Sequence, residues 1–165
     1  MIYLFSNNFE KSCATVSDLH LNETIIDAAF AVSHYLWHYH SDSVAFDAAH
    51  FYSLARVKQG VKSEIPRALF PEKNPQKDLY DWIIKSENNY AFMIQYLIAL
   101  NNEYEYRFSK KHKLSHIIPS LPKKRYEAIV NTSMIEQRIS RCIELYKSST
   151  SRWKWTNRDT PRYVI

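Results

Sequence analysis

The chain has 165 residues, 45% of them hydrophobic and 24% charged, a composition that supports one buried core and excludes wholesale disorder. It contains one glycine, and because tight β-turns need glycine where φ is positive, this scarcity favours an all-α fold and excludes P-loop, Rossmann and α/β-hydrolase enzymes. The formal net charge of +5 favours a polyanionic partner.

No apolar run approaches the roughly 20 residues that span a bilayer, so we expect no membrane partner. Met1–Phe5 has no basic region before it and no small-residue cleavage site, and it does not resemble a signal peptide. Cys13 and Cys142 lack metal-binding spacing, and two isolated thiols suit a reducing compartment. We therefore expect a cytoplasmic protein without a metal or another cofactor.

The start of the chain predicts an arm followed by a short helix. Ile2–Phe5 is typical of a short strand or an extended arm. Asn7 with Glu10 resembles a capping box, which opens a helix through about Val16.

A long helix is predicted next, capped by Ser17 or Asp18 and running to about His40. Its apolar positions recur at helical spacing, which marks the face that we expect to be buried: Ile25, Ala29, Val32 and Leu36.

The middle of the chain predicts a helix and then a loop. Asp42 or Ser43 starts the helix, and Gly60 closes it. Three prolines interrupt any helix between residues 61 and 76: Pro66, Pro71 and Pro75.

Residues 77–112 predict two helices joined near Ser86–Asn89. In the second, one apolar line and its neighbours face the core: Tyr90, Ile94, Leu97 and Asn101, with Met93, Tyr96 and Leu100. Pro119 and Pro122 mark the loop that follows.

The last predicted helix opens at a second candidate capping box, Ser133 with Glu136. Its buried face carries Ile135, Ile139, Cys142 and Tyr146. The tail beyond Ser151 fits no regular element. We therefore predict one all-α domain over residues 1–165, a compact helical bundle with an extended N-terminal arm and a basic-aromatic C-terminal tail.

A polar stripe runs along the long helix from 18 to 40. Seven residues make almost two turns, so His20, Asp27 and His34 share a side with Glu23 and His38. A carboxylate beside a histidine can form an acid/base pair. His34 and His38 with Asp27 are also an alternative metal site. A solvated helix face with common polar residues is the third interpretation.

Cations and aromatic rings gather near the end of the chain. The basic residues form two groups: Lys110, Lys111, His112, Lys113, Lys123, Lys124 and Arg125, then Arg152, Lys154, Arg158 and Arg162. Trp153, Trp155 and Tyr163 are interleaved with the second group. Cations contact phosphates and flat rings stack on bases, which favours nucleic-acid binding. The alternative is a solvated basic surface with the tryptophans packed in the core.

Four segments in chain order resemble a small phage and bacterial protein family. They are Asp18–Asp27; Trp82 with Ser86, Asn89 and Tyr90; Asn102–Lys113; and Trp155–Thr156 with Arg158 and Pro161. That family is distantly similar to the pyrimidine-dimer DNA glycosylases of the phage endonuclease V type. Those glycosylases are compact helical proteins that flip a base out of DNA and cut its glycosidic bond.

The resemblance implies a DNA glycosylase or base-modification enzyme that acts on pyrimidines in DNA. It implies an N-terminal amine as the nucleophile, here that of Met1, and a helix glutamate that stabilises the sugar cation, here replaced by Asp27. The signature histidine falls on His20, and Glu23 completes the candidate catalytic group. The candidate DNA contacts are Asn89, Tyr90, Arg107, Lys110, His112, Lys113, Arg152, Trp153, Lys154, Trp155 and Arg158.

The chain departs from the family pattern at four places. Glu23 replaces a lysine, Asp27 is one methylene shorter than glutamate, and Asn74–Pro75 replaces a His-Pro pair. Met1 precedes the bulky Ile2, so we expect methionine to be retained. These departures leave open an altered substrate and two alternative functions: a non-catalytic nucleic-acid- or nucleotide-binding protein, or a factor that binds an acidic host protein.

Overall fold

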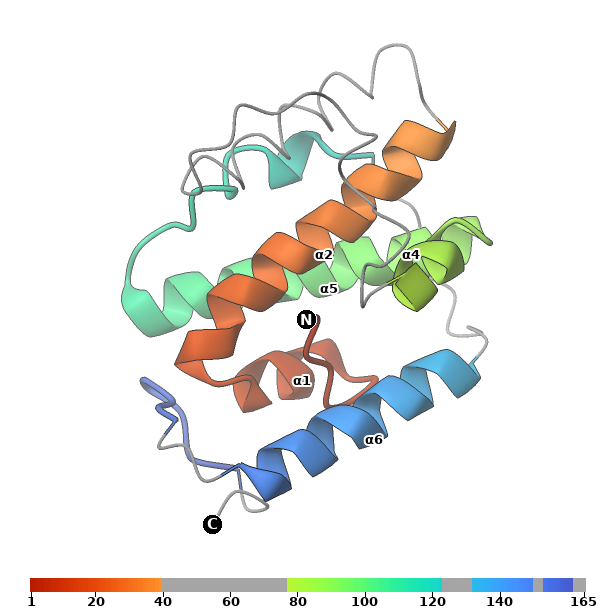
Figure 1. Ribbon diagram of the computed structural model, residues 1–165. Helices are drawn as coiled ribbons and strands as arrows, with labels where there is room; N and C mark the ends of the chain where they lie inside the picture. The colour runs from red at the N-terminus through yellow and green to blue at the C-terminus, as the bar shows by residue number, and fades with distance from the viewer. Residues whose placement is uncertain (40–76, 123–131, 150–152, 162–165) are drawn as a thin grey trace, which may run out of the picture.

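The computed structural model describes residues 1–39, 77–122, 132–149 and 153–161 (Figure 1). Within these ranges the elements are α1 (Phe9–Thr15), α2 (Asp18–Tyr39), α4 (Lys77–Ile83), α5 (Glu87–Phe108), the 3-10 helix η3 (Ile118–Ser120) and α6 (Thr132–Ser148). No strand occurs in the described ranges, so the predicted all-α fold is confirmed. The helix predicted to end at Gly60 and the loop over 61–76 lie outside them.

The N-terminal arm runs through the interior, between α2 and α6 (Figure 1). It forms no strand, but Ile2 and Leu4 are each only 1% exposed. The Tyr3 amide donates to Thr24 Oγ1 of α2 at 3.5 Å, and the Leu4 amide donates to Cys142 Sγ of α6 at 3.5 Å. The predicted arm is therefore part of the core, which fixes the position of the chain end.

Side-chain caps define the first two helices. The short helix predicted before Val16 is present, but its predicted cap is wrong by one residue. Asn8, not Asn7, caps α1, because its side chain accepts the Lys11 amide at 2.8 Å. Ser17 directly precedes α2 and accepts the His20 amide at 3.4 Å, in agreement with its predicted role.

Packing of α2 against α5 forms the centre of the core, and the apolar stripe predicted for the long helix is buried there in full. The predicted joint between α4 and α5 is also confirmed. Ser86 caps α5 by accepting the Asn89 amide at 3.1 Å. The helix ends at Ser109, whose φ of 50° places it in the left-handed region.

On the far side of the arm, α6 completes the bundle (Figure 1). Ile135, Cys142 and Tyr146 are buried, whereas Ile139, on the same predicted face, is half-buried. The predicted cap at Ser133 is wrong, because the chain is already helical at Thr132. No helix among the described residues is long and apolar enough to cross a membrane.

The tail, residues 153–161, has no regular structure and lies over the turn between α1 and α2. The Asp18 amide donates to the Lys154 carbonyl at 2.9 Å, and the Trp155 indole Nε1 donates to the Thr15 carbonyl at 2.9 Å. These bonds hold the tail beside the first turn of α2.

Candidate active site at the N-terminal amine

The amine of Met1 lies between two carboxylates of α2. It donates to Glu23 Oε1 at 2.6 Å and to Asp27 Oδ2 at 2.5 Å. Glu23 and Asp27 are four residues apart and therefore lie on one face of the helix. The Asp27 side chain is 16% exposed and that of Glu23 is 49% exposed. The structure thus brings together three of the four predicted catalytic residues.

The electrostatics of this site favour a charged amine. Burial by itself lowers the pKa of the Met1 amine, but the hydrogen bonds and charges of Asp27 and Glu23 outweigh burial and raise it above 8.0. The amine is therefore an ammonium group at neutral pH. Nucleophilic attack requires the neutral form, so a proton must first pass to a neighbouring base.

Tyr3 lies beside the carboxylates, and it is a site residue that sequence reasoning missed. Burial, reinforced by the charges of Glu23 and Asp27, raises its pKa to about 12. Its ring stacks on that of His20, with centroids 4.1 Å apart. The arm was predicted only as a short strand or an extended segment, and nothing in its residue pattern indicates that Tyr3 lies at the site.

His20, the fourth predicted catalytic residue, is stacked on the Tyr3 ring and is 8% exposed. Its Nδ1 lies 3.0 Å from Ser17 Oγ and 2.9 Å from the Tyr146 hydroxyl. The Tyr146 hydroxyl accepts the Ser17 amide at 3.0 Å, which leaves its own hydrogen to be donated to Nδ1. Burial lowers the pKa of His20, which favours a neutral ring, and in the tautomer that accepts from Tyr146 at Nδ1 the ring proton is on Nε2.

Trp153 of the tail closes the other side of the histidine. Its ring packs edge-on against His20, with centroids 4.9 Å apart, and is tilted against Tyr146, with centroids 4.2 Å apart. A predicted DNA contact and a predicted catalytic residue therefore meet in one aromatic cluster with Tyr3.

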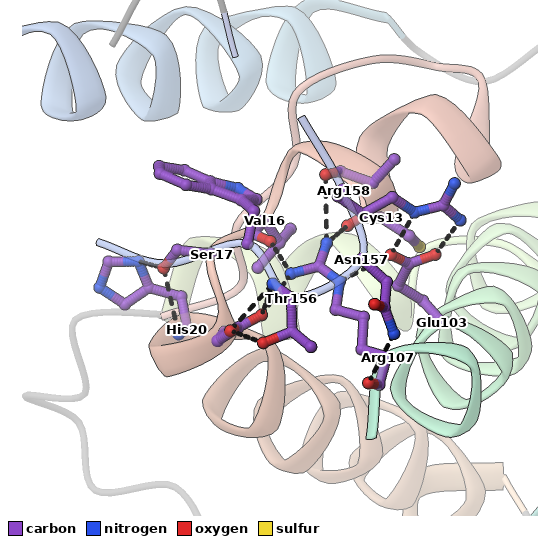
Figure 2. Close-up of polar contacts among 12 residues, drawn as sticks. Cys13, Val16, Ser17, His20, Glu103, Arg107, Thr156, Asn157 and Arg158 are labelled. Carbon is purple, nitrogen blue, oxygen red and sulfur yellow. Dashed lines mark hydrogen bonds and ion pairs between the residues drawn. The ribbon is translucent and has the colours of Figure 1, made fainter. Parts of the chain in front are cut away.

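Arg107, a predicted DNA contact, is a structural residue in this arrangement (Figure 2). Its side chain is 0% exposed. It donates to the Val16 carbonyl at 2.7 Å, to the Cys13 carbonyl at 3.0 Å, to Glu103 at 2.7 Å and to Asp18 at 3.0 Å. Its hydrogen-bonding capacity serves the α1–α2 turn, which leaves none for a phosphate.

Three further predicted contacts are also buried and bonded within the protein. Asn89 donates to the Trp82 carbonyl at 2.7 Å, and the Tyr90 hydroxyl donates to the Pro122 carbonyl at 2.7 Å. His112 lies 2.9 Å from the Asn22 amide oxygen, and burial lowers its pKa to about 4. Each connects helices or loops.

The remaining predicted contacts differ in exposure. Lys110 and Lys154 are exposed, Lys113 is half-buried, and Trp155 is buried against Thr15. Arg158 forms two hydrogen bonds with Glu103, at 2.9 and 2.7 Å, and lies over the Tyr106 ring at 4.2 Å. Arg152 lies outside the described residues, as do Asn74 and Pro75.

The three residues of the alternative metal site have different partners. Asp27 binds the Met1 amine, His34 packs against Tyr80 at 5.5 Å, and His38 is exposed beside Tyr39. Burial lowers the pKa of His34 to about 4. Within the described part of the chain, no group of three or more histidine, cysteine, aspartate or glutamate residues could hold a metal ion.

A groove of about 600 Å³ lies between α1, α5 and the tail, and no sequence pattern predicted it. Its walls include Phe9, Gln95, Tyr106 and Arg158. None of the four predicted catalytic residues lines it.

Comparisons of the chain with protein-family models, with curated proteins and with solved structures found no match.

Proposed function

We propose that this protein is a DNA N-glycosylase that acts on a modified or dimerised pyrimidine, with the amine of Met1 as the nucleophile. The observation that carries the proposal is the position of that amine, 2.5 Å from Asp27 and 2.6 Å from Glu23. Chain ends are usually poorly ordered, whereas this one is held by a buried arm. The resemblance to the endonuclease V type of glycosylase supports the same assignment.

The reaction begins when the ammonium of Met1 gives a proton to Asp27. The amine lone pair then bonds to C1′ of the deoxyribose, while the bond from C1′ to the base breaks and its electron pair leaves with the base. The base takes up the proton that Asp27 holds, and the nitrogen on C1′ then loses one proton to the freed Asp27 carboxylate, which supplies it to O4′ in the next step. Opening of the sugar ring then breaks C1′–O4′, protonates O4′ and forms an imine between Met1 and C1′. Water hydrolyses that imine and regenerates the amine.

Each neighbouring group has a role in this proposal. Asp27 is assigned the proton transfer because its Oδ2 is the nearer of the two carboxylate oxygens to the amine, and once it has passed the proton to the leaving base its charge stabilises the cation on the sugar. Glu23 holds the amine from the solvent side. The Nε2–H of His20 is available as a neutral donor, since Nδ1 is occupied by Ser17 and Tyr146.

A basic protein suits a DNA substrate. The net charge is +5, and exposed lysines remain at the end of α5 and in the tail. Both cysteines are buried free thiols, which is compatible with action in the cytoplasm.

Borohydride trapping tests the proposal directly. We expect duplexes that carry a thymine dimer or another modified pyrimidine to become cross-linked to the protein, because borohydride reduces the imine to a stable secondary amine. Peptide mass spectrometry should place the link on the Met1 nitrogen, after the same method has verified that this amine is the free chain end.

A variant with Gly-Ser added before Met1 is the control, since it moves the amine away from both carboxylates. A duplex with an abasic site reports amine reactivity without base release. Cross-linking to the abasic duplex but to no modified pyrimidine would show that the protein does not break the glycosidic bond of these bases.

The second candidate function is a non-catalytic nucleic-acid-binding protein. The raised pKa of the Met1 amine favours it, because an ammonium group paired with two carboxylates is a stable structural contact. It predicts binding without trapping on any duplex.

A further inference from the structure

Arg138 of α6 is a buried cation whose hydrogen bonds are long. Its side chain is 9% exposed. Nη1 donates to the Ile2 carbonyl at 3.5 Å, and Nη2 lies 3.4 Å from both carboxylate oxygens of Asp78. Its Nε is buried and has no hydrogen-bond partner. Charged hydrogen bonds of this kind are typically about 2.7–2.9 Å long.

Arg107 of the same molecule provides the contrast. Its hydrogen bonds measure between 2.7 and 3.1 Å and engage Nε and both terminal nitrogens. A purely structural arginine in this fold is thus fully bonded. Arg138 keeps unused donor capacity although its burial would ordinarily demand short bonds.

Arg138 is also close to the proposed nucleophile. It contacts the carbonyl of Ile2, the residue after Met1, at 3.5 Å. Two residues of extended chain span at most about 7 Å, so the guanidinium lies within about 11 Å of the amine. A DNA strand carries one phosphate per roughly 3.4 Å of helix axis, and Arg138 is therefore within about three nucleotides of the sugar that Met1 would attack.

Asp78 is the only partner of Arg138 among these contacts that is exposed to solvent, since its side chain is 61% exposed and Ile2 is buried. It lies in the first turn of α4. An exposed carboxylate held at 3.4 Å contributes little to stability. A phosphate oxygen would be a stronger acceptor for the same guanidinium, because it permits short paired bonds.

We propose that Asp78 occupies the place of a DNA backbone phosphate on Arg138 in the free protein, and that bound DNA displaces it. Arg138 is then the anchor that positions the strand at the Met1 amine. This inference deepens the proposed glycosylase function and rests on it for the choice of DNA as the ligand.

Two substitutions with opposite effects test the inference. Affinity for an unmodified duplex, which cannot react, is measured by fluorescence anisotropy at salt concentrations from about 50 to about 300 mM. Over roughly this range, affinity that depends on phosphate contacts falls steeply. Arg138→Met should weaken binding by roughly tenfold and reduce the slope of log K against log salt by about 0.9. Asp78→Asn should tighten binding, because it removes the competing carboxylate.

Matched controls separate this effect from net charge. Arg141→Met changes an exposed arginine on α6, and Asp81→Asn changes an exposed aspartate on α4 that pairs with Lys77. Each control should shift affinity less than its counterpart. Equal effects within a pair would overturn the inference, as would weaker binding by Asp78→Asn. Thermal melting of all four variants shows which of them are folded.

A separate measurement identifies the ligand. Inorganic phosphate alone should bind weakly, whereas the duplex should compete with it through Arg138. Binding of phosphate but not duplex would replace DNA by a small anion as the ligand and overturn the inference. Binding is measured independently of trapping, so loss of the glycosylase proposal leaves the Arg138 result interpretable.

Discussion

At the scale of single residues, Asp27 and Glu23 share the Met1 amine but differ in surroundings. Asp27 is 16% exposed and Glu23 is 49% exposed, so water weakens the second contact more than the first. The carboxylate at position 23, where the sequence resemblance leads one to expect a lysine, therefore gives the amine a second anionic partner. This pairing explains why the pKa of the amine is raised in spite of burial.

The two carboxylates should contribute unequally to trapping. Asp27→Asn keeps the shape and removes the charge, and we expect it to slow imine formation by on the order of 100-fold or more. Glu23→Gln should slow it by less than about tenfold, because Glu23 is more exposed. Single-turnover trapping on a modified duplex measures both rates.

Melting temperatures show whether the loss is chemical. Little change in melting for Asp27→Asn alongside the lost rate supports a catalytic carboxylate. A melting decrease large enough to account for the lost rate would make Asp27 a structural partner of the chain end.

At the scale of elements, the sequence was informative about helices and poor at locating burial. Periodicity correctly predicted the buried face of α2 and that of α5 except at Asn101, which is half-buried, because a 3.6-residue repeat is a local property. It could not distinguish Arg107 from Arg138, since each is one arginine in a helix. Arg107 was predicted to bind DNA from its place in the Asn102–Lys113 segment, yet tertiary packing makes it 0% exposed.

The chain end illustrates the same limit more strongly. No periodicity relates Met1 to Asp27, which is 26 residues away in the sequence. Their contact depends on the arm passing between α2 and α6. The family resemblance alone indicated an amine near this carboxylate, and it carried no information on Tyr3 or Arg138.

Arg107 should matter more for stability than any exposed cation. Replacing it with methionine removes the donor of several buried carbonyls and leaves Glu103 with Arg158 as its remaining cation, and loss of one partner from a buried ion pair costs about 3–5 kcal/mol. Urea unfolding should show a decrease of that size in the free energy of unfolding. Arg141→Met, an exposed change on α6, should stay within about 0.5 kcal/mol of the parent.

Arg107→Met also tests whether the order of the tail depends on the hydrogen bonds of Arg107. Asp18 accepts the Thr156 amide at 3.1 Å and bonds Arg107 at 3.0 Å, so the arginine orders the residue that holds the tail. Protease cleavage within residues 153–161 should therefore accelerate in Arg107→Met. Unchanged stability together with unchanged cleavage would remove the structural role assigned to this arginine.

At the scale of the whole molecule, the candidate active site and the hydrophobic core share the same segment of chain. The arm that carries the amine also fills the space between α2 and α6, and Tyr3 belongs to both the core and the site. Chemistry at the amine is consequently coupled to global stability, and the coupling can be measured without DNA.

The free energy of unfolding should depend on pH through the Met1 amine. Its pKa is above 8.0 in the folded protein because the hydrogen bonds and charges of Asp27 and Glu23 outweigh burial, and it returns to 8.0 when the chain unfolds. Between those two values the folded state binds more protons, so stability decreases as pH rises. The stabilisation is fully present below pH 8.0 and is lost as pH passes the folded pKa.

Other groups also titrate at alkaline pH, so a difference between two proteins isolates the amine. The buried cysteines weaken the parent and a variant alike, and Tyr3, whose pKa burial raises to about 12, does so nearly alike, because Asp27 is the smallest of the causes of its shift. In Asp27→Asn one anionic partner is gone and burial acts with less opposition, which lowers the pKa of the amine. The stability advantage of the parent over Asp27→Asn should therefore be greatest below pH 8.0 and shrink as the pH approaches 10.

Urea unfolding at closely spaced pH values measures this difference in the free energy of unfolding. Asp81→Asn is the control, and its difference from the parent should stay constant. A difference for Asp27→Asn that is equally constant would mean that the amine and Asp27 are not coupled in solution, and the proposed nucleophile would lose its support.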